Sequence, residues 1–272
     1  MKRKTLAACV LALGGVLASA GAHAQDSTAD GIAQYRAMLG DGGNPAELTE
    51  MAGEELWFEV RGPKQASMEQ CDLGQGPGVI EGAYSRLPRY FEDADRVMDL
   101  ESRLIYCMEN LQGLDRAEII KNAVSGSGEY ASEMESLVAY VVAASRGVTI
   151  EVPQDHPKER EAYERGKQIF YFRGGPYDFS CSSCHAVTGQ RIRLQDLPNL
   201  NEPELAQRAY SSWPAYRVSQ GALRTMQWRV RDCFRQQRMP VLDYGSQASV
   251  DLITYLAANA NGGEMDAPGL KR

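Results

Sequence analysis

The sequence predicts a mainly α-helical protein made of two tandem domains of one fold, residues 25–150 and 151–272. Two observations lead to this prediction. Apolar residues three and four positions apart, the spacing of a helix face, recur through much of the chain. In addition, residues 136–147 align without gaps on residues 251–262, and both segments read as helices that end in glycine, with leucine and tyrosine at matching positions. Two unrelated amphipathic helices are the alternative explanation of this similarity.

The first 24 residues differ from the rest and read as a secretory signal peptide. A basic start, Met1 to Lys4, precedes an apolar segment, and Ala22-His23-Ala24 matches the small-residue cleavage pattern. The apolar segment is short for a membrane span. We therefore expect a periplasmic protein that begins near Gln25 and is not held in a membrane. Losing three cations and no anions changes its formal charge from −7 to about −10, which disfavours nucleic acid as a partner.

The most informative motif is Cys181-Ser182-Ser183-Cys184-His185. C-x-x-C-H is the attachment signature of c-type haem, in which two thiols bind the vinyl groups and the adjacent imidazole binds the iron. A zinc or redox C-x-x-C is the alternative. Zinc would need two further thiol or imidazole ligands at similar spacing, and the sequence has no second C-x-x-C and no H-x-x-x-H. We therefore predict one haem c bound covalently through Cys181 and Cys184, with His185 as an axial ligand.

Helices along the mature chain are predicted from periodicity, caps and chain breakers. Asn44 and Pro45 start a helix, with asparagine as the N-cap and proline in the first turn. The Gly- and Pro-rich residues 74–82 are expected to form a loop. The remaining predicted helices cover residues 28–39, 95–111, 128–147, 158–171 and 250–260, and residues 147–157 connect the two domains.

The first half contains a segment that resembles an altered second haem motif. Cys71 lies about as far before the helix at 136–147 as Cys184 lies before its counterpart. The segment from Met68 to Asp72 reads as a C-x-x-C-H frame in which the first thiol and the histidine are replaced. We therefore expect the first half to be a degenerate, haem-less cytochrome c-like domain.

The second axial position of the iron has several candidates. His156 lies in the predicted connection between the domains, which disfavours it. A methionine would give a high-potential His/Met electron carrier. In an oxidising compartment two of the three remaining cysteines should pair, which leaves one free thiol. The methionines that follow the motif are Met226, Met239 and Met265, and the cysteines outside it are Cys71, Cys107 and Cys233.

The surroundings of Cys233 favour it as the ligand. Five arginines and a single acid lie between residues 224 and 238. A solvated cationic helix face is the ordinary explanation of such a segment, but here it surrounds an odd cysteine in an acidic protein. Cationic neighbours lower the pKa of a thiol, and iron coordination deprotonates it. Guanidinium groups also bind small oxyanions. This combination indicates a haem site for sulfur chemistry.

Together these segments resemble the SoxA family, the catalytic c-type cytochrome subunits of the SoxAX complexes of thiosulfate oxidation. The resemblance covers nearly the whole mature chain. It implies tandem cytochrome folds, with the active-site haem held by His185 and by Cys233, which the family often carries as a persulfide. It also places Arg229 as the active-site arginine. The matching segments are Ser180–His185, Trp213–Arg217, Arg229–Cys233 with Gln236 and Arg238, and Leu104–Gly113.

The resemblance also bears on the first half. In two-haem members of the family this half binds another haem through C-x-x-C-H. Here Asp72 stands at the histidine position and Met68 at the first thiol position, which resembles the one-haem branch. Cys71 and Cys107 occupy the surviving positions, and the resemblance implies that they form a disulfide.

The function implied by the resemblance is that of an L-cysteine S-thiosulfotransferase, which joins thiosulfate oxidatively to a cysteine of the carrier protein SoxYZ. Cys233 would be the sulfur-reactive centre, Arg229 would bind thiosulfate, and Arg231 or Arg238 would assist. Forming the sulfur–sulfur bond releases two electrons and one haem stores one, so the cytochrome SoxX is an expected partner, with a downstream cytochrome c as acceptor. The alternatives are a periplasmic His/Met electron carrier and a haem-based redox sensor, for which no output domain is recognisable.

Overall fold

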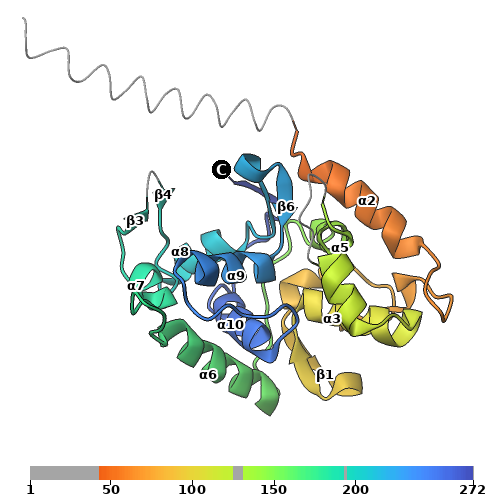
Figure 1. Ribbon diagram of the computed structural model, residues 1–272, viewed down its shortest axis with the longest axis horizontal. Coiled ribbons are helices and arrows are strands. Elements are labelled where there is room, and N and C mark those ends of the chain that lie inside the picture. Colours follow the sequence, from red (N-terminus) through yellow and green to blue (C-terminus); the bar gives the residue numbers. More distant parts are fainter. Residues whose placement is uncertain (1–42, 125–130, 193–194, 272) are drawn as a thin grey trace, which may run out of the picture. The chain divides into compact units, whose positions relative to one another are not determined.

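The computed structural model describes residues 43–124, 131–192 and 195–271. The predicted signal peptide, residues 1–24, and the helix predicted over 28–39 lie outside these ranges. Helices dominate the described structure, as predicted (Figure 1). Pro45–Arg272 forms one compact unit, so both predicted domains contribute to it, and the boundary at residue 150 stays a prediction. None of the described helices has the length and apolar character needed to cross a membrane.

The helices begin largely at side-chain caps. Asp99, Ser132 and Thr225 each accept a hydrogen bond from a backbone N–H three residues ahead, which satisfies a donor that the first turn leaves unpaired. The α-helices are α2 (Ala46–Phe58), α3 (Leu100–Cys107), α4 (Arg116–Glu118), α5 (Glu133–Ala143), α6 (Pro157–Tyr171), α7 (Cys181–His185), α8 (Pro203–Tyr210), α9 (Met226–Gln236) and α10 (Gln247–Ala258). The shorter turns are the 3-10 helices η1 (Met68–Gln70), η2 (Tyr84–Arg86), η3 (Glu92–Ala94) and η6 (Val218–Gln220), and the π-helical η4 (Met108–Gln112) and η5 (Ile119–Val124).

The strands are short and form small sheets. β1 (Arg89–Phe91) pairs with β2 (Arg96–Met98), and β3 (Arg191–Ile192) pairs with β4 (Gln195–Asp196), both antiparallel. β5 (Ala215–Arg217) lies between β6 (Ala222–Arg224), antiparallel to it, and β7 (Gly269–Lys271), parallel to it. The register sets Arg217 beside Lys271, although 54 positions separate them in the numbering.

Several predicted helices are confirmed with shifted ends. α5, α6 and α10 lie within or close to the predicted ranges 128–147, 158–171 and 250–260, and residues 74–82 contain no helix. α2 begins at Ala46, one residue later than expected. The helix expected over 95–111 was predicted too early, because Arg96–Met98 pairs as β2 before Asp99 caps α3.

The internal similarity corresponds to a repeated helix crossing. α2 packs against α5, and α6 packs against α10. Gly53 of α2 faces the Ser136 carbonyl group and Gly166 of α6 faces that of Asp251, so closely that an added Cβ would overlap the carbonyl oxygen in both pairs. Ser136 and Asp251 are the first residues of the two aligned segments, so the matching sequences have matching packing roles.

A second series of elements also occurs twice. The order β1–η3–β2–α3 in the first half returns as β5–η6–β6–α9 in the second. Each copy follows a cis proline, Pro88 or Pro214. Shortly before these prolines lie Tyr84 and Tyr210, whose rings stack with centroids 6.3 Å apart. The repeated order agrees with two halves of one architecture.

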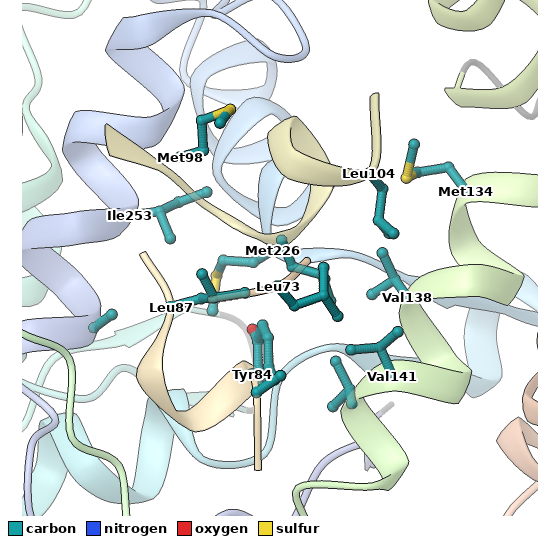
Figure 2. Packing of buried hydrophobic residues seen from close by; sticks show 14 of the residues in the cluster. Leu73, Tyr84, Leu87, Met98, Leu104, Met134, Val138, Val141, Met226 and Ile253 are labelled. Carbon is teal, nitrogen blue, oxygen red and sulfur yellow. The ribbon is translucent and has the colours of Figure 1, made fainter. Parts of the chain in front are cut away.

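The two halves share a hydrophobic core. A single cluster of buried residues includes side chains from both. Figure 2 shows Leu73, Tyr84 and Val138 of the first half gathered with Met226 of α9 and Ile253 of α10. Burial of apolar surface is the main favourable contribution to folding, so neither half completes its core without the other.

Candidate haem and sulfur site

The predicted haem motif forms the short helix α7. Ser180 caps it: the Ser183 N–H donates to Ser180 Oγ at 3.2 Å, and the Ser180 N–H donates to Ser183 Oγ at 3.0 Å. This reciprocal cap winds the motif into one turn and a half. Cys181, Cys184 and His185 are therefore carried by one short, capped helix, as attachment of two thiols and one imidazole to the same cofactor requires.

The backbone orients the His185 ring. Its Nδ1 lies 3.0 Å from the Pro198 carbonyl oxygen. A carbonyl oxygen only accepts, so Nδ1 carries the proton and Nε2 is left free to bind a metal. Burial lowers the pKa of His185, and the charge of Arg229 lowers it further, against the opposing effect of the Pro198 carbonyl. The neutral imidazole, the form that ligates iron, is therefore favoured.

Cys233 of α9 lies close to the motif thiols. Burial, followed by the charges of Cys233 and Cys184, raises the pKa of Cys181 to about 12. The charge of Cys184 also raises the pKa of Cys233. Such mutual effects need short separations, because the interaction of two charges falls with distance. All three thiols are free, and the fold brings them together although α9 and α7 are far apart in the sequence.

The pKa of Cys233 differs from the expectation. The arginine-rich sequence predicts a lowered value. In the structure burial raises the pKa of this thiol, and Arg229 and Arg217 lower it without reversing the effect. Desolvation outweighs the cations because the enclosed thiolate loses its hydration. Coordination to iron is the interaction that would deprotonate this thiol.

The charge of Arg229 acts on Cys233 and lowers the pKa of its thiol. Arg229 precedes Cys233 by one helical turn, so both project from one face of α9. Its guanidinium carbon lies 5.5 Å from the centroid of the Trp213 ring. The Asp232 carboxylate is 3.9 Å away, too far for a hydrogen bond, so the donors of Arg229 are not consumed by that acid.

The two other candidate arginines have different surroundings. Arg231 donates to the Leu242 carbonyl oxygen, and its guanidinium carbon lies 4.9 Å from the centroid of Tyr244. The guanidinium of Arg238 lies over Tyr177, 5.5 Å from the ring centroid, in the loop before α7. The structure thus brings Arg229 to Cys233, sets Arg231 on a different side of α9, and places Arg238 beside the loop that leads into the haem motif.

Arg217 is a residue of this site that the sequence analysis missed. Its charge lowers the pKa of Cys233. Burial lowers the pKa of Arg217 itself, and the charge of Arg229 lowers it further. The one available signal in the sequence is its place at the end of Trp213–Arg217, a segment that resembles the SoxA family.

The alternative axial ligands are buried or distant from the motif. Met226 and Met265 are 7% and 2% exposed and belong to the large hydrophobic cluster. Met239 is 5% exposed in the same cluster. His156 is the N-cap of α6, and its ring accepts a hydrogen bond there. The length of α6 then separates His156 from α7.

The residues at the site suit a haem better than a bare metal ion. Across residues 43–124, 131–192 and 195–271, no three side chains of histidine, cysteine, aspartate or glutamate are grouped to hold a metal ion. Large apolar side chains that precede and follow α7 in the sequence are instead exposed. Contact with an apolar cofactor would remove them from water. These residues are Phe172, Tyr177, Phe179, Val187 and Ile192.

Comparison with known proteins gives consistent matches. Residues 52–150 match the SoxA/TsdA cytochrome c domain family. The chain is 54% identical over 241 residues to the L-cysteine S-thiosulfotransferase subunit SoxA of Hydrogenophilus thermoluteolus, covering 89% of this chain and 87% of that protein. It is 35% identical over 263 residues to a SoxA subunit of Hydrogenobacter thermophilus, with 96% and 95% covered. The crystal structure of SoxXA from P. pantotrophus aligns with a TM-score of 0.68 at 26% identity, over 84% of this chain and 79% of that one.

Proposed function

Because the chain belongs to the SoxA family, we propose that it acts as an L-cysteine S-thiosulfotransferase subunit that joins thiosulfate to a cysteine of the carrier protein SoxYZ. One observation carries the proposal: Cys233, on α9, lies within electrostatic range of the thiols of the haem motif, with Arg229 on the same helix face. A His/Met electron carrier needs neither a free thiol near the haem nor an arginine beside that thiol.

Cys181 and Cys184 would hold one haem c, with His185 and Cys233 as its axial ligands. When bound, the haem takes up and passes on electrons one at a time. The chain contributes the imidazole of His185, which the Pro198 carbonyl group orients. It also contributes the thiol of Cys233, whose pKa is raised by burial, so that the thiolate is disfavoured until it binds iron. The family often carries this cysteine as a persulfide, which would put a second reactive sulfur on Cys233.

The reaction must dispose of one proton and two electrons. The outer sulfur of thiosulfate bonds to the sulfur of the carrier cysteine, that thiol loses its proton, and two electrons leave with no bond to oxygen broken. One haem stores one of them. A second acceptor is therefore needed, and we propose the haem of the partner cytochrome SoxX, which a downstream cytochrome c would reoxidise.

Arg229 would bind and orient thiosulfate at Cys233. Its guanidinium presents forked donors that match an oxyanion, and its nearest acid, Asp232, has both carboxylate oxygens hydrogen-bonded to Arg235 and Gln236. Arg238, beside the loop before α7, is placed to assist. The contacts of Arg231 with Leu242 and Tyr244 make it the weaker candidate.

We propose further that the first half, residues 25–150, is a cytochrome c-like domain that has lost its haem. The family model of a cytochrome c domain matches this half. Cys71 and Cys107 are joined in a disulfide, so neither thiol can bind haem. Asp72, at the histidine position, accepts hydrogen bonds from the N–H groups of Gly74 and Gly76 and so shapes a turn. A disulfide and a signal peptide both fit a periplasmic location.

The test is an electron paramagnetic resonance spectrum of the ferric, haem-loaded protein, together with thiosulfate conjugation to the carrier. We expect a low-spin thiolate signal that Cys233→Ala abolishes along with activity. Met239→Leu is the matched control and should change neither. A spectrum that Cys233→Ala leaves intact and Met239→Leu alters would instead identify a His/Met electron carrier.

A further inference from the structure

We infer that Arg217 and Lys271 form, together with Arg229, a binding site for the sulfonate group of thiosulfate beside Cys233. The identity of the anion rests on the proposed function. The existence of an anion site rests on four observations: a buried Arg217 Nε without a partner, the strand register that adds a lysine, the engagement of the nearest acid, and the nearness of Cys233 to Arg217 and Arg229.

Arg217 ends β5 without a direct ion-pair partner in the described part of the chain. Its Nε is buried and has no hydrogen-bond partner. Its electrostatic neighbours include Arg229, Asp232 and Cys233. Arg217 is only partly buried, and holding a partly buried cation beside a second cation costs free energy. An anion that bridges Arg217 and Arg229 would recover it, and would satisfy the Nε donor.

Lys271 joins this group through the sheet. β7 runs parallel to β5, and the register places Lys271 beside Arg217. Neighbours in register project from the same face of a sheet. Burial lowers the pKa of Lys271, Arg217 lowers it further, and Asp266 opposes both effects, which agrees with a lysine that lies near the arginine. In the described residues no acid lies within ion-pair distance of Lys271.

The acids of this region leave the positive charge in excess. Asp232 is buried, and its two oxygens accept from Arg235 at 2.6 Å and Gln236 at 2.5 Å. Asp266 lies near enough to influence Lys271. Among the residues that the structure describes, these three cations thus face two acids, of which one is already engaged. The site therefore favours a dianion.

Thiosulfate has the shape and charge that this arrangement selects. A guanidinium fork and an ammonium group together can hold the oxygens of its sulfonate end. Its outer sulfur, which carries no oxygen, would then be directed toward Cys233. Arg217 and Lys271 are in this account binding residues for the sulfonate, and they would set the preference for a sulfonate-bearing dianion over a neutral sulfur compound.

The test is equilibrium dialysis of the haem-loaded protein with labelled sulfate and labelled thiosulfate. Sulfate is an unreactive dianion with the same arrangement of oxygens, so its binding needs no turnover. We expect Arg217→Gln to weaken binding of both anions by at least about tenfold, Arg217→Lys to recover part of the affinity, and Lys271→Gln to weaken it by a smaller factor. Arg86→Gln is the matched control, because Arg86 pairs with Glu151 at the surface, and it should bind as wild type.

The electron paramagnetic resonance spectrum of the haem distinguishes a loss of anion binding from damage to the haem site. Arg217→Gln should retain a low-spin thiolate signal, since Arg217 is not an iron ligand in this account. Binding of both anions within twofold of wild type in Arg217→Gln would overturn the inference, even if the protein conjugates thiosulfate. Arg217-dependent sulfate binding in a protein that fails to conjugate thiosulfate would support the anion site and reject the proposed function.

Discussion

The backbone N–H of Gln227 donates to Glu101 Oε2 at 3.0 Å. Each is the second residue of its helix, Gln227 in α9 and Glu101 in α3, and these helices occupy matching places in the two halves. The Gln227 side chain also donates to Asp99, the cap of α3. Hydrogen bonds therefore join the first turns of α3 and α9 inside the shared core. They link α9, the helix that carries Cys233, to the first half of the chain.

Glu101 should make the protein less stable as pH rises. Burial, with the charge of Asp99, raises the pKa of Glu101 to about 8. The folded chain then keeps a proton that the unfolded chain loses near pH 5, so stability falls between about pH 5 and 8, by up to about 1.4 kcal/mol per pH unit. Glu101→Gln keeps the acceptor for Gln227 and should remove this fall, as measured by urea unfolding at pH 5.5 and 8.

The surface variant Glu151→Gln controls for a change of net charge and should keep the wild-type pH profile. The difference between the profiles of wild type and Glu101→Gln isolates this one group from the other titrating side chains. Parallel profiles would mean that Glu101 is charged in the folded protein.

Gly166→Ala should destabilise the haem half. The added Cβ would overlap the Asp251 carbonyl oxygen where α6 crosses α10, so the helices must separate, at a cost of about 1 to 3 kcal/mol. Lys167→Ala, at the next and exposed position of α6, is the control and should change little. Thermal unfolding of both variants checks this, and equal midpoints would contradict the tight crossing.

Arg224→Gln should lower the free energy of unfolding much more than Arg86→Gln does. Arg224 pairs with Glu135 at 2.6 Å, and their side chains are 12% and 5% exposed. Burial already raises the pKa of Glu135, and removing its partner leaves a buried carboxylate at a cost of about 3 to 5 kcal/mol. Arg86 pairs with Glu151 at the surface, where loss of an ion pair is barely measurable. Similar denaturation midpoints for the two variants would refute the distinction.

Replacing both Cys71 and Cys107 by serine should lower stability without altering the haem spectrum. The disulfide closes a loop over a sequence separation of 36, for which the chain-entropy model gives about 3 to 4 kcal/mol. Non-reducing peptide mapping of the wild type should recover the linked peptides. Free thiols at both positions would overturn the account of a first half that lost its haem.

Local patterns carried most of what could be predicted. The apolar periodicity of residues 128–147 predicted α5, because a helix face can be recognised within a few positions. Ser132, the cap that fixes its first residue, was not identified from the sequence. β2 was missed because Arg96–Met98 becomes a strand only by pairing with Arg89–Phe91. The sheet of β5, β6 and β7 was missed for the same reason, since β7 joins it from the end of the chain.

The sequence by itself determined the haem-attachment motif and the spacing of Arg229 and Cys233. Cys181, Cys184 and His185 must be adjacent to reach one cofactor, and Arg229 is one helical turn from Cys233, so both relations are visible along the chain. Only the tertiary structure decided that Arg217 also acts on that thiol. Arg217 and Lys271 meet through strand pairing. Burial then lowers the pKa of both and raises the pKa of Cys233, because desolvation depends on what the whole fold encloses.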